Sequence, residues 1–189
     1  PFPYCHHCKS CDKKQGGGCC LNPIDDLEVL LKQQSAPQET AAILIEPVLG
    51  EGGYVQAPAE YMRKLREICD KHNILLIVDE VQSGYGRTGK FWGIEYSGVR
   101  PDVLIMAKGI ASGLPLAGIA ANHKLFENSP PGTLGGTYGG NVVACAAANA
   151  TLDVILEENV LSNVQKRGEQ LKDGLNKLQK KYSFISDVR

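Results

Sequence analysis

The run Ile74-Leu75-Leu76-Ile77-Val78-Asp79 decides the fold of this chain. Apolar residues in an unbroken series that ends at a carboxylate are typical of a strand buried on both faces of a sheet. The residues before it, from about Ala59, carry apolar side chains at helical spacing and predict a helix. A helix that leads directly into a buried strand indicates an α/β fold with parallel strands.

The same alternation is present on the N-terminal side of this run. Asn22 is the predicted N-cap of a helix that has Pro23 at its first position and continues to about Gln34. Residues 43–45 are apolar and mostly β-branched, which predicts a buried strand that stops at Glu46. A second helix and strand therefore precede the first pair.

Two more buried strands are predicted downstream, Val103 to Met106 and Leu116 to Ala121. The roughly nine residues between them are too few for a parallel crossover, so these two strands should be antiparallel. An alanine-rich helix follows from about Ala144, and Ser162 with Gln165 predicts a capping box that opens a final helix. The predicted buried stripe of that final helix consists of Val164, Leu171, Leu175 and Leu178. This order of elements predicts an α/β fold in which a mostly parallel sheet has helices on both faces.

Composition and charge exclude several classes of partner. The chain has 189 residues, of which 43% are apolar and 22% charged, so it can bury a sizeable core. Its net charge of −1 provides no basic surface for nucleic acid or for an anionic membrane. The longest apolar stretch, Val142 to Leu156, contains polar residues and is shorter than the roughly 18–20 residues that span a bilayer. We therefore expect neither nucleic acid nor a membrane as a partner.

Residues 1–21 form a cysteine-rich segment or loop insert. Five of the seven cysteines lie in it, namely Cys5, Cys8, Cys11, Cys19 and Cys20. Together with His6 and His7 they are metal-ligand residue types at tight spacing, but a second C-x-x-C at zinc-ribbon distance is missing. We therefore expect free thiols and no metal, with a bound metal as the alternative. Free thiols indicate a reducing, intracellular compartment, cytoplasmic or mitochondrial.

Three charged residues follow predicted strands: Glu46, Asp79 and Lys108. Ligands of open α/β sheets bind outside the carboxyl ends of the strands, so these side chains should converge on one crevice. A lysine amine can form a Schiff base with pyridoxal phosphate, and a carboxylate can keep the pyridine nitrogen protonated. Lys108 and Asp79 are the residues predicted for these two tasks.

A dinucleotide-binding motif is the competing interpretation, because Gly84 to Gly89 matches G-x-G-x-x-G and follows a strand. That motif should open a helix. Here the aromatic and glycine-rich residues 90–93 follow it instead and predict a loop. We therefore do not expect a dinucleotide site.

Three motifs resemble the class III pyridoxal-phosphate-dependent aminotransferases, the 4-aminobutyrate aminotransferases in particular. They are Glu46 to Gly53, Asp79 to Gly84 and Gly135 to Asn141, and the resemblance extends over nearly all the chain from about Ile24. It implies that residues 22–189 are an incomplete large domain of the aspartate aminotransferase-like transferase fold. The family's glycine-serine phosphate loop would then lie upstream, and its small C-terminal domain downstream, so we expect the fragment to be inactive by itself.

The resemblance also implies roles for individual residues. Lys108 would hold pyridoxal phosphate as a Schiff base and move the proton at the substrate carbon. Asp79 would pair with the pyridinium nitrogen, Gln82 would hydrogen-bond the phenolic oxygen, and Val81 would pack on the ring. Thr137 would bind the phosphate of the cofactor in the neighbouring subunit, which implies a homodimer with a shared active site.

The implied reaction is transamination from a 4-aminobutyrate-like ω-amino acid to 2-oxoglutarate. Glu51 resembles the switch carboxylate of the family, and Glu46 is the other residue predicted to face the substrate. Ornithine or acetylornithine aminotransferase, an aminomutase and a decarboxylase remain alternatives, because they share the cofactor residues. A non-catalytic, metal-binding paralogue is the alternative from a different class.

Overall fold

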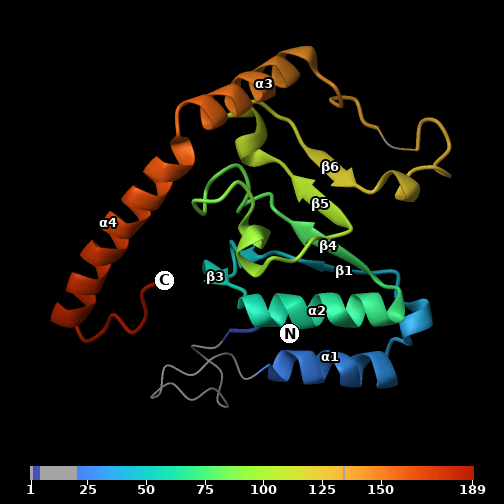
Figure 1. Ribbon diagram of the computed structural model, residues 1–189, viewed down its shortest axis with the longest axis horizontal. Coiled ribbons are helices and arrows are strands. Elements are labelled where there is room, and N and C mark those ends of the chain that lie inside the picture. Colours follow the sequence, from blue (N-terminus) through green and yellow to red (C-terminus); the bar gives the residue numbers. More distant parts are fainter. Residues whose placement is uncertain (1, 5–20, 134) are drawn as a thin grey trace.

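The computed structural model describes residues 2–4, 21–133 and 135–189. Its centre is a four-stranded sheet (Figure 1). The strands, in spatial order, are β1 (Ala42–Ile45), β4 (Leu75–Asp79), β5 (Val103–Met106) and β6 (Gly118–Ala121). The β1–β4 and β4–β5 pairs are parallel, whereas β6 is antiparallel to β5. The predicted mostly parallel sheet with an antiparallel last pair is therefore confirmed.

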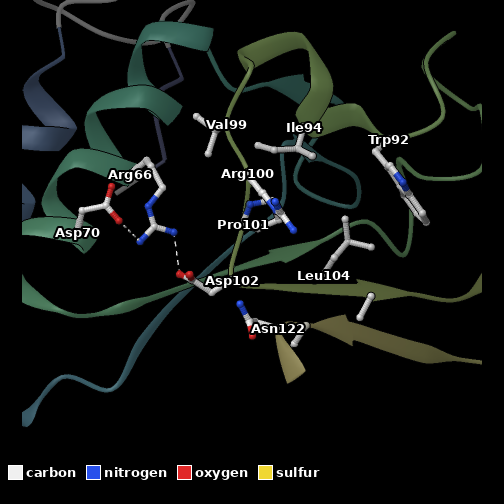
Figure 2. Close-up of a pocket in the computed structure, with 12 residues that line it drawn as sticks. Arg66, Asp70, Trp92, Ile94, Val99, Arg100, Pro101, Asp102, Leu104 and Asn122 are labelled. Carbon is white, nitrogen blue, oxygen red and sulfur yellow. Dashed lines mark hydrogen bonds and ion pairs between the residues drawn. The ribbon is translucent and has the colours of Figure 1, made fainter. Parts of the chain in front are cut away.

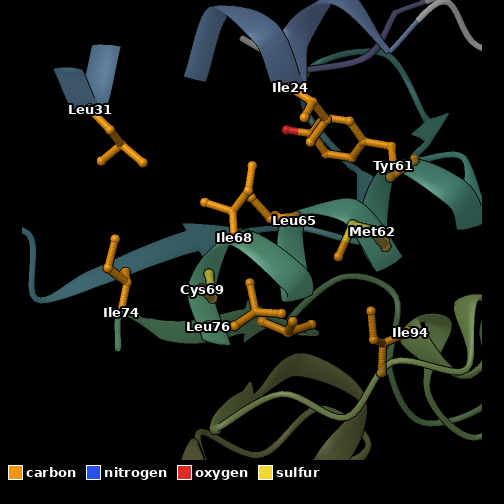
Figure 3. Close-up of a cluster of buried hydrophobic side chains, with 12 residues drawn as sticks. Ile24, Leu31, Tyr61, Met62, Leu65, Ile68, Cys69, Ile74, Leu76 and Ile94 are labelled. Atoms are coloured by element: carbon orange, nitrogen blue, oxygen red, sulfur yellow. The ribbon is translucent and has the colours of Figure 1, made fainter. Parts of the chain in front are cut away.

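Helices α1 (Asn22–Gln33) and α2 (Ala59–His72) form a layer that covers one face of the sheet. The main core is the cluster of buried side chains to which Leu65 of α2 and Leu76 of β4 belong (Figure 3), and Val78 of β4 is buried in the same cluster. Burial of such side chains stabilises each of them by about 1.5–3 kcal/mol. This packing fixes the direction of β4 and hence the place of Asp79 at its end.

The other face of the sheet is more open than the sequence predicts. Leu44 of β1 is 61% exposed and Ile119 of β6 is also exposed, so these strands are not buried on both sides. Ile43 and Ile45 pack against the main core, because alternate residues of a strand point to opposite faces. The last strand also begins later than expected, at Gly118 instead of Leu116.

The start of α1 differs from the prediction by one residue. Leu21, not Asn22, is the N-cap, and it adopts a left-handed conformation with φ of 56°. The backbone N–H of Ile24 donates to the Leu21 carbonyl, and the Leu21 side chain packs against the main core. Contact of this side chain with the core therefore takes the place of a side-chain cap, and Pro23 stands in the first turn as expected.

Helices α3 (Val142–Glu157) and α4 (Val160–Lys181) form the C-terminal part. Asn141 caps α3, since its side chain accepts hydrogen bonds from the backbone N–H groups of Val143 and Ala144. The predicted capping box of the last helix is wrong: α4 begins after Asn159, which has φ of 58°. The Gln165 side chain instead donates to the Gly89 carbonyl, 2.9 Å away, and so connects α4 to the loop after β4.

The predicted buried stripe of α4 is also wrong. No residue of this helix is buried, Val164 is half-buried, and Leu171 is 65% exposed. The helix contacts α3 and then extends away from the sheet (Figure 1), so apolar side chains of its second half, such as Leu171, are exposed. Helical periodicity thus predicts the helix correctly, but not what it packs against.

Two short strands were not predicted, β2 (Val48–Leu49) and β3 (Val55–Gln56), which pair antiparallel. Residues 84–89 form turns and no helix, so the prediction that this glycine motif is not a dinucleotide site is consistent with the fold. Within the described ranges, none of the helices is both long and apolar enough to cross a membrane. Cys5 to Cys20 lie outside the residues that the structure describes.

Candidate active site

Three charged residues stand along the carboxyl edge of the sheet. Asp79 is the last residue of β4, Glu46 follows β1 directly, and Lys108 comes two residues after β5. Because these three strands are parallel neighbours, their carboxyl ends lie at the same edge. The topology therefore brings together the residues that the sequence predicts at strand ends.

Lys108 is exposed, and its Nζ donates a hydrogen bond to Oε1 of Gln82. The residue opens a short 3₁₀ helix, η3 (Lys108–Ala111), with φ of 45°. A lysine in this left-handed region is uncommon, and such conformations are frequent at functional sites. The next residue is Gly109, where a Cβ would lie 3.0 Å from the Cβ of Tyr85, so the chain passes close to this ring.

Asp79 is half-buried and bonds within its own loop. Its Oδ1 accepts a hydrogen bond of 2.9 Å from the backbone N–H of Val81, and the side chain of Val81 is half-buried. The second oxygen, Oδ2, makes no hydrogen bond to any other part of the chain that the structure describes. The carboxylate is thus held by one oxygen and has acceptor capacity left on the other.

Glu46 stabilises a turn of the backbone. Its Oε2 accepts a hydrogen bond of 2.9 Å from the backbone N–H of Gly50. A Cβ at Gly50 would lie 2.9 Å from Cγ of Gln82, so glycine at this position permits the turn to approach the glutamine side chain. Glu46 therefore lies near the Lys108 and Gln82 pair, with its carboxylate directed to its own loop.

Glu51 and Thr137 are not brought to this group of residues by hydrogen bonds. Glu51 is exposed in the turn between β2 and β3. Thr137 is exposed in the segment before α3, and this segment follows β6, which runs away from the carboxyl edge (Figure 1). Among the described residues, no hydrogen bond or ion pair joins Thr137 to Lys108, although its neighbour Tyr138 lines a pocket with Pro115 and Leu116, just before β6.

Glu80 is a residue that the sequence interpretation missed. It is 0% exposed, and it accepts hydrogen bonds from the backbone N–H groups of Gly93 and Ile94, at 2.9 and 2.7 Å, and from the Ser83 hydroxyl. Burial raises the pKa of Glu80, while these three hydrogen bonds act in the opposite direction. A signal was present in the sequence, because strand alternation places residue 80 on the same face as the buried Val78 and opposite Asp79.

A groove of about 800 Å³ lies elsewhere, between α2, β5 and β6 (Figure 2). Arg66, Asp102, Asn122 and Trp92 are among the residues that line it, and none of the predicted site residues does. Arg66 pairs with Asp102 at 2.7 Å across one end. Asp102 precedes β5, so that end of the groove is at the amino edge of the parallel strands and the groove is separate from the candidate site.

A mostly parallel sheet with an exposed lysine amine at its carboxyl edge defines an α/β protein of the class that binds small molecules beyond its strand ends. Comparison with known proteins identifies the family. The family model described as aminotransferase class-III matches residues 2–189, and the chain belongs to this family. The cofactor of the class III aminotransferases is pyridoxal phosphate.

The chain is similar to curated members and to solved structures of the family. It is 49% identical to the 5-aminovalerate aminotransferase of Pseudomonas putida and 46% identical to the 4-aminobutyrate aminotransferase of Escherichia coli, in each case over 166 residues, 88% of this chain and 39% of the relative. The ornithine aminotransferase structure from Toxoplasma gondii superimposes with a TM-score of 0.81 at 34% identity, over 88% of this chain and 38% of that one. The chain thus spans about two fifths of the length of these relatives.

Proposed function

We propose that the full-length protein transfers the amino group of an ω-amino acid, 4-aminobutyrate or a close homologue, to 2-oxoglutarate, with pyridoxal phosphate held on Lys108. The observation that supports this proposal is the hydrogen bond from the Lys108 amine to Gln82 at the carboxyl edge of the sheet, where Asp79 also lies. The names of two curated relatives, a 5-aminovalerate and a 4-aminobutyrate aminotransferase, support an ω-amino acid as donor.

The side chains at this edge fit the proposed cofactor. The Lys108 amine bonds to the neutral amide of Gln82 and forms no ion pair with a carboxylate of the described residues. The Asp79 oxygen that accepts no hydrogen bond from described residues provides an acceptor for a protonated ring nitrogen. Both features are what a carbonyl-binding lysine and a pyridinium partner require.

The residues of this chain would divide the work as follows. When bound, pyridoxal phosphate supplies an electron sink for the substrate carbon. Lys108 Nζ would hold the cofactor and then carry the proton at that carbon, Asp79 would keep the ring nitrogen protonated, and Gln82 and Val81 would orient the ring. Glu51 and Glu46 are proposed to face the substrate, with Glu51 as the residue that distinguishes the two amino donors.

The experiment replaces Lys108 in the full-length protein. Lys108→Ala should lose the visible absorption of bound cofactor and the borohydride-fixed adduct on the peptide that contains residue 108. Lys124→Ala, at an exposed lysine of the 3₁₀ helix η4 (His123–Leu125) after β6, should retain both. A reducible adduct in Lys108→Ala would refute the assignment. Initial rates with 4-aminobutyrate, 5-aminovalerate, ornithine and acetylornithine would then identify the donor, since an ornithine aminotransferase is also among the similar structures.

We further propose a homodimer in which Thr137 serves the cofactor of the neighbouring subunit. The support is that residues 135–141 resemble the family motif and that Thr137 is exposed in this chain, with no hydrogen bond to its own Lys108 among the described residues. When Lys108→Ala and Thr137→Ala subunits are reassembled together, half of the dimers should be mixed, with one of two sites intact, so about a quarter of the wild-type activity should return at limiting cofactor. Activity that only averages the two parent variants would place Thr137 in its own subunit.

The compartment also stays a prediction, intracellular and either cytoplasmic or mitochondrial. Fractionation of cells that express the full-length protein would test it.

A further inference from the structure

Glu80 is a buried carboxylate that the proposed reaction does not use. It follows Asp79 directly, yet the two side chains belong to opposite faces of the sheet, because side chains alternate along a strand. Asp79 is half-buried, whereas Glu80 is 0% exposed. A buried carboxylate without a cation is costly unless donors surround it, and Glu80 has three.

These hydrogen bonds connect three separate parts of the chain. The carboxylate of Glu80 accepts from the backbone of Gly93 and Ile94, which open the 3₁₀ helix η2 (Gly93–Ser97), and from the Ser83 hydroxyl. The backbone N–H of Glu80 donates to the Ile105 carbonyl of β5, 2.9 Å away, and its own carbonyl accepts from Gly84 at the same distance. Residues 81–83 are thus held in place by hydrogen bonds to both the side chain and the backbone of Glu80.

The packing around the carboxylate has no spare room. A Cβ at Gly93 would lie 3.1 Å from Cβ of Ser83 and 3.2 Å from Oε2 of Glu80. A Cβ at Gly84 would lie 2.7 Å from Cζ3 of Trp92 and 2.8 Å from the Glu80 carbonyl oxygen. Glycine at both positions therefore allows the two loops to close over the carboxylate.

The segment that Glu80 fixes is the segment that carries Gln82, whose amide bonds to Lys108. The Glu80 N–H donates to the carbonyl of Ile105 in β5, and Lys108 follows Ile105 by three residues along the chain. A small change in the path of residues 81–83 would therefore move the Gln82 amide relative to the lysine. Displacements of about 1 Å in such groups are sufficient to lower the rate of an enzyme substantially.

We propose that Glu80 is a positioning residue of the cofactor site, which holds residues 81–83 so that the Gln82 amide faces the Lys108 amine. The inference rests on the proposed function for the identity of the cofactor, and on the hydrogen bonds above for the positioning. Glu80 itself touches neither substrate nor cofactor and acts through the loop.

The test uses Glu80→Gln in the full-length protein. The amide keeps the size of the side chain, but it has one acceptor oxygen, and its NH₂ group faces backbone N–H donors. Glu95→Gln is the matched control, because Glu95 is an exposed carboxylate of the same 3₁₀ helix that also accepts a backbone hydrogen bond, from Trp92 at 2.7 Å. Both variants replace a carboxylate by an amide of the same size, so they differ in the burial of the side chain and in the donors that surround it.

We expect three changes in Glu80→Gln and none in Glu95→Gln. In the cofactor-free protein, hydrogen exchange of the peptide that contains Gln82 should become about tenfold faster, because buried donors lose their acceptor. The dissociation constant for pyridoxal phosphate should rise about tenfold, and the pH midpoint of the visible band of the bound cofactor should move. A merely structural role would lower the thermal unfolding temperature without moving that midpoint.

The outcomes separate this inference from the proposed function. If wild-type protein does not bind pyridoxal phosphate, the proposed function fails, and the exchange measurement still tests the control of residues 81–83 by Glu80. Wild-type exchange, affinity and pH midpoint in Glu80→Gln would overturn the inference. If that variant does not fold, Ser83→Ala removes one of the three donors and should shift exchange and pH midpoint in the same direction, and an unchanged Ser83→Ala would overturn the inference as well.

Discussion

The carboxylate of Asp102 should be worth far more to the sheet than the carboxylate of Asp70, although both bind the same arginine. Asp102 Oδ2 accepts from Arg66 Nη1 and from the backbone N–H of Leu76, both at 2.7 Å (Figure 2 shows the arginine pair). The Asp70 carboxylate forms an ion pair with Arg66, at 2.8 Å, and has no other side-chain partner among the described residues. The side chains are 34% and 68% exposed, respectively.

The magnitude follows from the two bonds of Asp102. Leu76 is fully buried, and a hydrogen bond from its N–H to a charged acceptor contributes about 1.5–3 kcal/mol. The ion pair with Arg66 is partly exposed and adds at most about 1 kcal/mol after screening by solvent. Asp102→Ala should therefore cost about 2–4 kcal/mol, and Asp70→Ala less than about 1 kcal/mol.

The assay is hydrogen exchange of the peptide that contains Leu76, followed by mass spectrometry. In the regime where exchange reports the opening free energy, each 1.4 kcal/mol is about tenfold, so Asp102→Ala should speed exchange by about 30-fold to several hundredfold. Asp70→Ala should stay within about fivefold. Asp102→Asn keeps the acceptor oxygen for Leu76 and should fall between them, near the Asp70 variant.

Equal exchange in Asp102→Ala and Asp70→Ala would refute this reasoning. It would mean that water entering from the groove replaces the lost acceptor at no cost, so the buried N–H of Leu76 would not depend on Asp102. Equal and large effects of Asp102→Asn and Asp102→Ala would assign the contribution to charge instead of to the acceptor.

Three further outcomes follow from burial. Burial raises the pKa of Glu80 above 4.5, so its contribution to stability is fully present below that pH and is lost as the pH rises through the folded pKa; thermal unfolding across this range should show a downward slope that Glu80→Gln lacks. Burial raises the pKa of Cys69 to about 11, so iodoacetamide and peptide mapping should find Cys145 modified well before Cys69. Gly84→Ala places a Cβ 2.8 Å from the Glu80 carbonyl oxygen and should lower the free energy of unfolding by about 1–3 kcal/mol in urea titrations, whereas Gly135→Ala, which meets nothing within 4 Å, should not.

The order and direction of the sheet strands could be predicted because they depend on local patterns. The run of residues 74–78 and the helix before it are each sufficient to identify their element. The short connection between β5 and β6 excludes a parallel crossover, which fixes their direction without any knowledge of the tertiary structure. The hairpin of β2 and β3 escaped detection because strands of two residues have no periodicity to observe.

The start of α2 at Ala59 was predicted correctly, but the starts of α1 and α4 could not be predicted because tertiary contacts replaced the local caps. At α1 the chain begins its helix at a left-handed Leu21, whose side chain packs on the core. At α4 the residue expected to complete a capping box, Gln165, bonds to Gly89, which is 76 positions away in the sequence. A local motif shows which hydrogen bond a side chain can form with residues near it in the sequence. Whether the side chain bonds to a more distant acceptor instead depends on the tertiary structure.

The carboxylates at the carboxyl edge of the sheet also show that local sequence cannot predict which hydrogen bonds form. The sequence places Glu46 and Asp79 at strand ends correctly, but it does not tell which oxygen remains available. The structure bonds Glu46 to Gly50 and one oxygen of Asp79 to Val81, both within their own loops. Glu80, one residue beyond, is surrounded by donors because it continues the buried face of β4.

The difference between Glu80 and Asp79 has a physical cause. A carboxylate on the face covered by α2 must find its donors inside the protein, whereas one on the other face can present an oxygen to a ligand. Strand alternation therefore separates the buried carboxylate of Glu80 from the half-buried carboxylate of Asp79, even though the two are neighbours in the sequence.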